Sequence, residues 1–290
     1  MEKFVALTAS GIATGAAIAI VALGFLVLYK ATGVINFAHG DLITLGSYIA
    51  YWAISSLGLP TLLGYLVALV LMFGVGVGLE RVAHAPLRRR PPMVVVIATL
   101  AAAIAIRGAL SLWYGSDPKS LPSPVGDGSV DVLGATIATQ RLLIIGVTAA
   151  AVLLLVAVFQ RTAFGTRLRA LASDQDTARL VGVRTRPISM VVFGLSAVLA
   201  TLAGILVAPL SAIDLNFGFE MMILAFAAAV LGGFGSLGGV AAGALIVGLT
   251  QQLVGGYVWP DYATTLPYAL LFAVIMLRPS GLVDVGRSRL

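Results

Sequence analysis

The side chains that could carry out chemistry in this chain are few and far apart. Its 290 residues include no cysteine and only two histidines, His39 and His84, whose separation does not suit a metal site. The apolar stretches hold no cluster of Ser with His and no paired Asp, so an enzyme is not indicated and no cofactor is expected. The chain also lacks the Gly-x-x-x-x-Gly-Lys-Ser/Thr loop that cradles nucleotide phosphates, so it cannot use ATP hydrolysis by itself.

A small group of polar residues interrupts otherwise apolar sequence. Asn36, His39 and Asp41 stand beside two glycines, a pattern that predicts irregular backbone. At membrane depth such backbone is tolerated only where protein or water satisfies it, which favours a cavity or an internal interface. The alternative is a polar loop at the cytoplasmic membrane surface. Arg107 lies within another apolar stretch, where it either contacts a substrate or partner subunit or pairs internally.

The most basic segment, Arg161 to Pro187, is patterned like two short helices. Its signals are the punctuating glycines Gly165 and Gly182, the capping pair Ser173 and Asp174, and small apolar residues on one face, Leu168, Leu171 and Ala172. A short amphipathic helix facing the cytosol can dock in a groove of a soluble partner. The other interpretation is a solvated loop whose arginines only set the membrane orientation.

A glycine-rich run extends from Gly232 to Gly239, with five glycines in eight residues. Glycine at this density breaks a helix and also lets neighbouring backbones approach closely. It favours a tight cytoplasmic hairpin, and the alternative is a turn between two half-helices that line a transport pathway.

These residues must be positioned by helices in a membrane. Hydrophobic residues make up 60% of the chain and charged residues 10%, too few charges to cover the surface of a soluble domain. The expected fold is a single all-α polytopic membrane domain over residues 1–290, with about 8 or 9 transmembrane helices. Six long spans are expected at Val5–Leu28, Leu42–Leu57, Thr61–Leu79, Met93–Tyr114, Leu142–Phe159 and Ile188–Leu210, and three short or broken ones at Met221–Leu231, Val240–Val254 and Leu266–Leu277.

The distribution of basic residues predicts the orientation. Most of the eighteen Lys and Arg residues fall in alternate loops, which places those loops inside, the N-terminus outside and the C-terminus in the cytoplasm. Residues 114–140 then form an outer loop rich in turn residues. Because the basic residues are divided among separate loops, nucleic-acid binding is not indicated.

Three segments resemble the LivH-type permeases for branched-chain amino acids. They are Gly33–Asp41 with the following Leu45–Tyr48, the basic segment with its short helices, and Leu231–Gly239. Their order and spacing fit that family over nearly the whole chain. The resemblance implies a permease subunit of an ATP-binding-cassette importer in a bacterial cytoplasmic (inner) membrane. Its partners would be cytoplasmic ATPase subunits, a second homologous permease subunit, an external solute-binding protein, membrane lipid and the small-molecule substrate.

The resemblance also suggests roles for residues. ATPase coupling is expected at residues 161–187, through Gly165, Arg167, Leu168, Arg169, Ala172, Asp174 and Gly182. The translocation pathway is expected beside Asn36, His39, Asp41, Arg107, Gly232, Gly233 and Gly235.

Other transport classes remain open from the residues alone. Related permeases for urea and short amides carry similar segments, and a passive channel is not excluded. An ion-coupled secondary transporter would need intramembrane carboxylates, and only Asp41 is placed to serve, which argues against that class.

Overall fold

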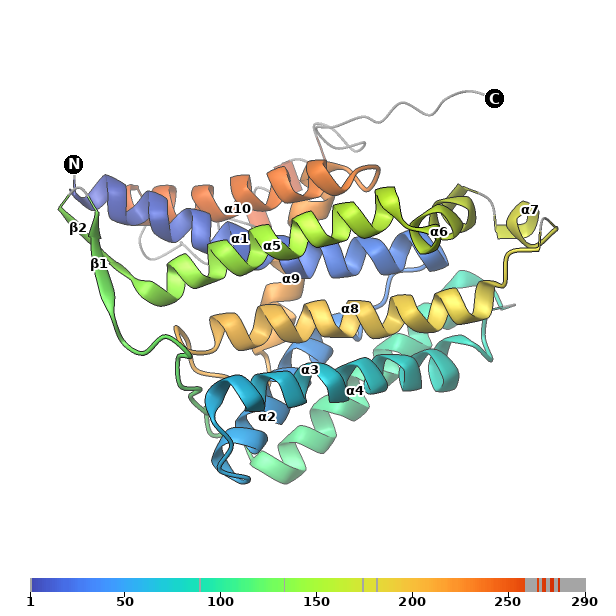
Figure 1. The fold of residues 1–290 in the computed structure, drawn as a ribbon, viewed down its shortest axis with the longest axis horizontal. Coiled ribbons are helices and arrows are strands. Elements are labelled where there is room, and N and C mark those ends of the chain that lie inside the picture. Colours follow the sequence, from blue (N-terminus) through green and yellow to red (C-terminus); the bar gives the residue numbers. More distant parts are fainter. Residues whose placement is uncertain are drawn as a thin grey trace. The chain divides into compact units, whose positions relative to one another are not determined.

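A computed structural model describes residues 2–88, 90–132, 134–173, 175–180 and 182–258, and a few residues beyond them (265, 268, 269, 272, 273 and 276). Within this part the elements in chain order are α1 (Glu2–Thr32), α2 (His39–Ser55), α3 (Thr61–Leu79), the π-helical turn η1 (Glu80–His84), α4 (Pro92–Tyr114), β1 (Ser129–Val132), β2 (Ala135–Ala138), α5 (Thr139–Arg161), α6 (Ala163–Ser173), α7 (Gln175–Leu180), α8 (Thr185–Val207), α9 (Phe217–Gly232) and α10 (Leu237–Tyr257) (Figure 1). Asp174 and most of the expected span Leu266–Leu277 lie outside the described residues.

Six helices of the described chain are long and apolar enough to cross a bilayer: α1, α3 with η1, α4, α5, α8 and α10. The predicted polytopic helical fold is confirmed. One detail differs from the expected spans. Helix α10 has 21 residues and is longer than the short segment expected there. Helix α2, which covers most of the expected span Leu42–Leu57, has 17 residues and is at the short end of the range for a full crossing. Helix α9 is short, as predicted, with 16 residues. The side of the membrane on which each terminus lies stays a prediction.

Local sequence explains where several helices begin. Proline precedes the first residue of α3 and occupies the first position of α4, where its missing N–H costs nothing and its fixed φ suits a helix. Helix α10 begins after Ser236, whose hydroxyl accepts a hydrogen bond from the Gly239 N–H at 2.8 Å.

The segment expected as an outer loop, residues 114–140, contains an antiparallel hairpin. Strand β1 pairs with β2, with Val130 opposite Ile137 and Asp131 opposite Thr136. Each strand is only four residues long, so its alternation of polar and apolar residues is too short to stand out in a segment rich in turn residues. The sequence therefore did not predict the hairpin.

The chain divides into two compact units, one of residues 1–23, 125–150 and 221–290 and the other of residues 24–124 and 151–220. In the second unit, α8 packs against both α2 and α3. In the first unit, the beginning of α1 packs against α10 through small residues: a Cβ on Gly248 would lie 2.3 Å from the Gly15 nitrogen. The expectation of a single permease domain stays a prediction.

The glycine-rich run forms a tight helical hairpin in the first unit. Helix α9 ends at Gly232, Gly233 has φ of +78°, and α10 begins four residues later. A Cβ on Gly232 would lie 2.1 Å from the carbonyl oxygen of Gly239, so side chains at these positions would separate the two helices. The geometry is that of the predicted tight hairpin.

Candidate functional site: a buried polar cluster and a basic helical segment

The polar segment between α1 and α2 is buried. The Asn36 side-chain oxygen accepts a hydrogen bond from the Ala38 N–H at 3.0 Å, and the Phe37 N–H donates to the Thr99 hydroxyl of α4 at 3.2 Å. Asn36, His39 and Asp41 are all buried. Of the two interpretations of this segment, the internal interface therefore describes its surroundings and the exposed surface loop does not.

His39 anchors the start of α2 halfway along α8. Its Nδ1 atom lies 3.2 Å from the hydroxyl of Ser196, a residue at the middle of the 23-residue helix α8. The imidazole is 0% exposed and lies edge-on to Phe25. From this point α2 follows the second half of α8, with Gly46 against Thr201. Helix α2 therefore begins beside the middle of α8 and not beside one of its ends.

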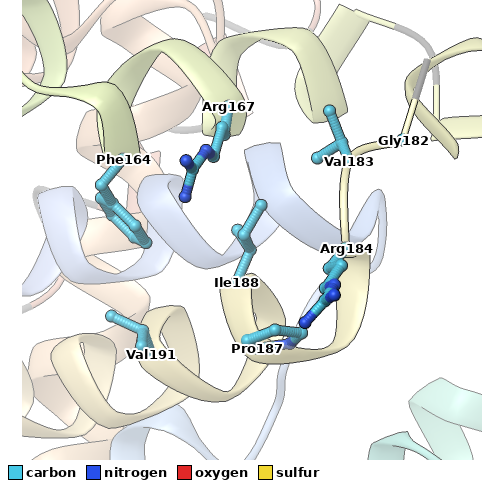
Figure 2. A pocket seen from close by; sticks show the side chains of 8 residues that line it. All are labelled: Phe164, Arg167, Gly182, Val183, Arg184, Pro187, Ile188 and Val191. Atoms are coloured by element: carbon cyan, nitrogen blue, oxygen red, sulfur yellow. The ribbon is translucent and has the colours of Figure 1, made fainter.

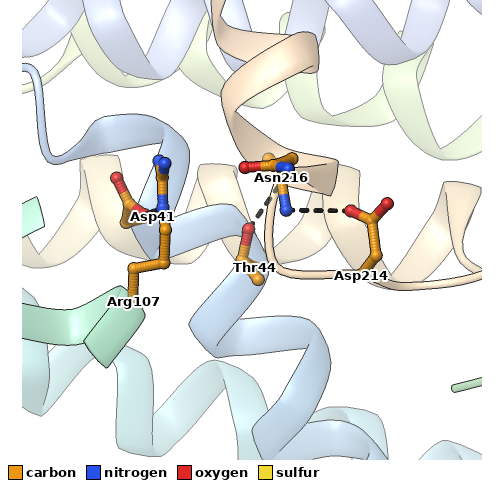
Figure 3. Close-up of polar contacts among 6 residues, drawn as sticks. Asp41, Thr44, Arg107, Asp214 and Asn216 are labelled. Atoms are coloured by element: carbon orange, nitrogen blue, oxygen red, sulfur yellow. Dashed lines mark hydrogen bonds and ion pairs between the residues drawn. The ribbon is translucent and has the colours of Figure 1, made fainter. Parts of the chain in front are cut away.

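Helix α9 begins at the same place. The Gly218 N–H donates to the Thr44 hydroxyl of α2 at 3.0 Å, and Gly218 also lies against the backbone of Gly40. Just before α9, the Asn216 N–H donates to the Asp214 carboxylate at 2.8 Å, which closes the turn into the helix (Figure 3). Discontinuous helices whose ends meet inside a bundle are a common way to build a transport site.

The ion pair Asp41–Arg107 lies beside this junction. Arg107 Nε donates to Asp41 Oδ1 at 3.0 Å, and the two side chains are 36% and 3% exposed respectively (Figure 3). The guanidinium carbon lies 5.5 Å from the centroid of the Phe219 ring, close enough for a cation–π contact. Arg107 stands within α4, about two turns before its end. The internal pairing considered for this arginine is thus present.

The remaining predicted pathway residues lie elsewhere. Gly232, Gly233 and Gly235 belong to the other compact unit, at the end of α9 and in the turn before α10. Thr44 and Phe219, which contact the polar junction, were not singled out from the sequence. A hydroxyl and an aromatic ring inside apolar segments carry no local signal of such a role.

The basic segment contains the two short helices predicted for it, α6 and α7. The Gly165 N–H donates to the Thr162 hydroxyl at 3.1 Å, and Arg169 Nη1 donates to the Phe159 carbonyl oxygen at 2.5 Å. These bonds hold α6 to the end of α5. Gly182, with φ of +84°, follows α7 in the left-handed conformation that glycine tolerates best.

The predicted docking residues divide between two faces of α6. Gly165 is buried and Leu168 is 1% exposed, because both face inward. Arg167, Arg169 and Ala172 are exposed. The apolar side of α6 is therefore used inside the chain, and only the other side is free to meet a partner.

A groove of about 630 Å³ lies between α6 and the start of α8 (Figure 2). Its apolar wall includes Ile188 and Val191, and Arg167 and Arg184 bring positive charge to it. Among the described residues no group of three or more His, Asp or Glu side chains could hold a metal ion. The surface chemistry of the segment is thus basic and apolar.

Comparisons with known proteins agree with this architecture. The family profile described as "Branched-chain amino acid transport system / permease component" matches residues 7–275. The high-affinity branched-chain amino acid transport system permease protein LivH of Salmonella typhimurium is 32% identical over 287 residues, which cover 94% of this chain and 93% of that protein. The corresponding protein BraD of Pseudomonas aeruginosa is 30% identical over 289 residues, with 94% of each chain covered.

A solved structure has a similar fold. PsaBC from Streptococcus pneumoniae, in complex with Fab, matches with a TM-score of 0.50 and 15% sequence identity, over 95% of this chain and 93% of that one. At this identity the likeness concerns the fold alone.

Proposed function

Since this chain belongs to the branched-chain amino acid transport permease family, we propose that it is a permease subunit of an ATP-binding-cassette importer that carries leucine, isoleucine or valine across the bacterial cytoplasmic membrane. The observation that carries the proposal is the similarity to LivH along 94% of the chain. The six long apolar helices supply the membrane-spanning body that such a subunit needs.

The energy comes from partner subunits in this proposal. The chain has no phosphate-binding loop of its own, so cytoplasmic ATPase subunits hydrolyse ATP and move the permease between its states. A second homologous permease subunit completes the pathway, and an external binding protein delivers the solute. Gly232 lets α9 and α10 approach closely, and Gly233 permits the turn between them.

The ATPase contact is proposed at the outward face of α6. Arg167, Arg169 and Ala172 are exposed there, whereas Gly165 and Leu168 hold the helix in place from behind. Gly182 permits the turn that leads from α7 into α8. Apolar and basic groups together suit a groove on a soluble protein that carries acidic residues at its rim.

Replacing Ala172 by Asp tests this contact without disturbing the inner face of α6. The variant should lose ATPase subunits on co-purification, because a carboxylate is costly to desolvate in an apolar interface. Val130→Asp is the control, since Val130 is also an exposed apolar residue but lies in the hairpin. Full ATPase association in Ala172→Asp would exclude this surface as the docking face. Leu168→Asp is not a suitable test of the docking surface, because Leu168 is buried and the new carboxylate would disturb the packing of α6 itself.

The whole proposal is tested by co-purifying the chain with the products of neighbouring genes and reconstituting the complex in vesicles. ATP-driven uptake of labelled leucine, isoleucine or valine is expected, and it should stop when the ATPase subunit carries an inactivating substitution. Uptake of urea or a short amide in place of these amino acids would assign the chain to a different substrate. Uptake that continues without ATP would identify a passive channel.

A further inference from the structure

The guanidinium of Arg107 has an unused edge. Its Nε atom bonds to Asp41, and within the described part of the chain neither Nη1 nor Nη2 makes a hydrogen bond. The side chain is 36% exposed, in contrast to the 3% exposure of Asp41. A guanidinium carries its donors in a planar fork, so the two terminal nitrogens form a second binding edge after Nε is occupied.

This edge requires a polar neighbour. Charged groups inside membrane helices face the bundle interior or a water-filled cavity, because hydrocarbon cannot satisfy their hydrogen bonds. Asp41 neutralises the charge of Arg107, but it accepts a hydrogen bond only from the Nε atom of that arginine. The Phe219 ring stands 5.5 Å from the guanidinium carbon. The charge is thus held at a defined place, next to the junction where α2 and α9 begin, and its bonding capacity is not exhausted.

We propose that Arg107 binds the carboxylate of the transported solute through Nη1 and Nη2, with Asp41 as the residue that positions the guanidinium. A carboxylate matches the fork with two parallel hydrogen bonds, which urea or a neutral amide cannot provide with equal charge complementarity. The inference rests on the proposed import of amino acids. It deepens that function by naming the group that recognises the carboxylate of the solute.

The test uses the complete importer in vesicles, with saturating binding protein and ¹⁴C-labelled leucine, isoleucine and valine. Arg107→Gln should lower uptake per ATP hydrolysed by about tenfold or more, since a charge-assisted bidentate contact is lost. The decisive variant is the double substitution Asp41→Asn with Arg107→Gln. Its two amides can still bond to each other, so a purely structural pair would transport normally. Recognition of a carboxylate predicts that the double variant assembles with its ATPase yet transports as poorly as Arg107→Gln.

Arg107→Lys covers the case in which neutral variants do not assemble. It keeps the positive charge beside Asp41 but loses the planar fork, and an uptake rate about tenfold lower than that of the parent is expected. Wild-type uptake in the double variant or in Arg107→Lys would overturn the proposal while leaving amino acid import intact. If instead the unmodified importer moves urea or acetamide and no amino acid, the proposed function fails and the carboxylate site fails with it.

Discussion

Replacing Gly165 by alanine is expected to loosen helix α6. An added Cβ would lie 2.3 Å from the carbonyl oxygen of Phe159 and 2.5 Å from that of Val158, both backbone atoms at the end of α5. Ordinary contact would require α6 to move by about 1 Å. Both oxygens are backbone atoms and cannot move aside as the end of a flexible side chain could. The added Cβ therefore weakens the packing of α6 against the end of α5.

The size of the effect follows from what holds α6 in place. Leu168 and Leu171 are buried and contribute about 1.5 to 3 kcal/mol each. Overpacking a close contact costs about 1 to 3 kcal/mol. The penalty is therefore a large share of the stabilisation without exceeding it, and α6 should open more often but not detach.

Hydrogen exchange in lipid nanodiscs measures this opening. A loss of about 1 to 3 kcal/mol accelerates exchange of the α6 amides about 5- to 150-fold when exchange reports the open population. Solute uptake per ATP hydrolysed should fall in parallel if α6 transmits the movement of the ATPase subunits to the permease. Gly146→Ala is the control, because a Cβ there meets nothing within 4 Å. Unchanged exchange in α6 of Gly165→Ala would refute the packing argument.

Three further predictions concern buried contacts. In this cysteine-free chain, Leu168→Cys should react with a polar maleimide far more slowly than Ala172→Cys, and equal rates would show that Leu168 faces outward. Gly248→Ala should destabilise the detergent-solubilised protein by about 1 to 3 kcal/mol in thermal unfolding, because its Cβ meets the backbone of α1, whereas Gly238→Ala, with open space around it, should be near neutral. His39→Ala should cost about 2 to 4 kcal/mol by the same measurement, and wild-type stability would contradict the role of His39 as a buried anchor.

The long spans were predictable because hydropathy and length are local properties. Five of the expected long spans correspond to α1, α3, α4, α5 and α8. The pattern of residues 161–187 likewise predicted two short helices, which α6 and α7 confirm. The direction of its apolar face was not predictable, since a stripe that packs inward and a stripe that binds a partner have the same spacing. Leu168 was expected at the docking surface, but its side chain is buried because the apolar face of α6 packs inward.

The polar cluster was predictable only in part. Asn36, His39 and Asp41 stand out because they interrupt apolar sequence. The hydrogen bond between His39 and Ser196 joins residues 157 positions apart, and the Asp41–Arg107 pair spans 66 positions. Pairing over such distances depends on how helices pack, and no single segment contains that information.

The amino-acid sequence by itself determined the membrane class, the helical fold and the family motifs, because lipid admits only segments that satisfy their own backbone and that requirement is visible residue by residue. The tertiary structure alone decided that Asp41 meets Arg107, that α2 begins beside the middle of α8, and that the apolar face of α6 is occupied from within. Those outcomes depend on the close packing of distant helices, where a glycine or a hydroxyl sets how near two backbones can come.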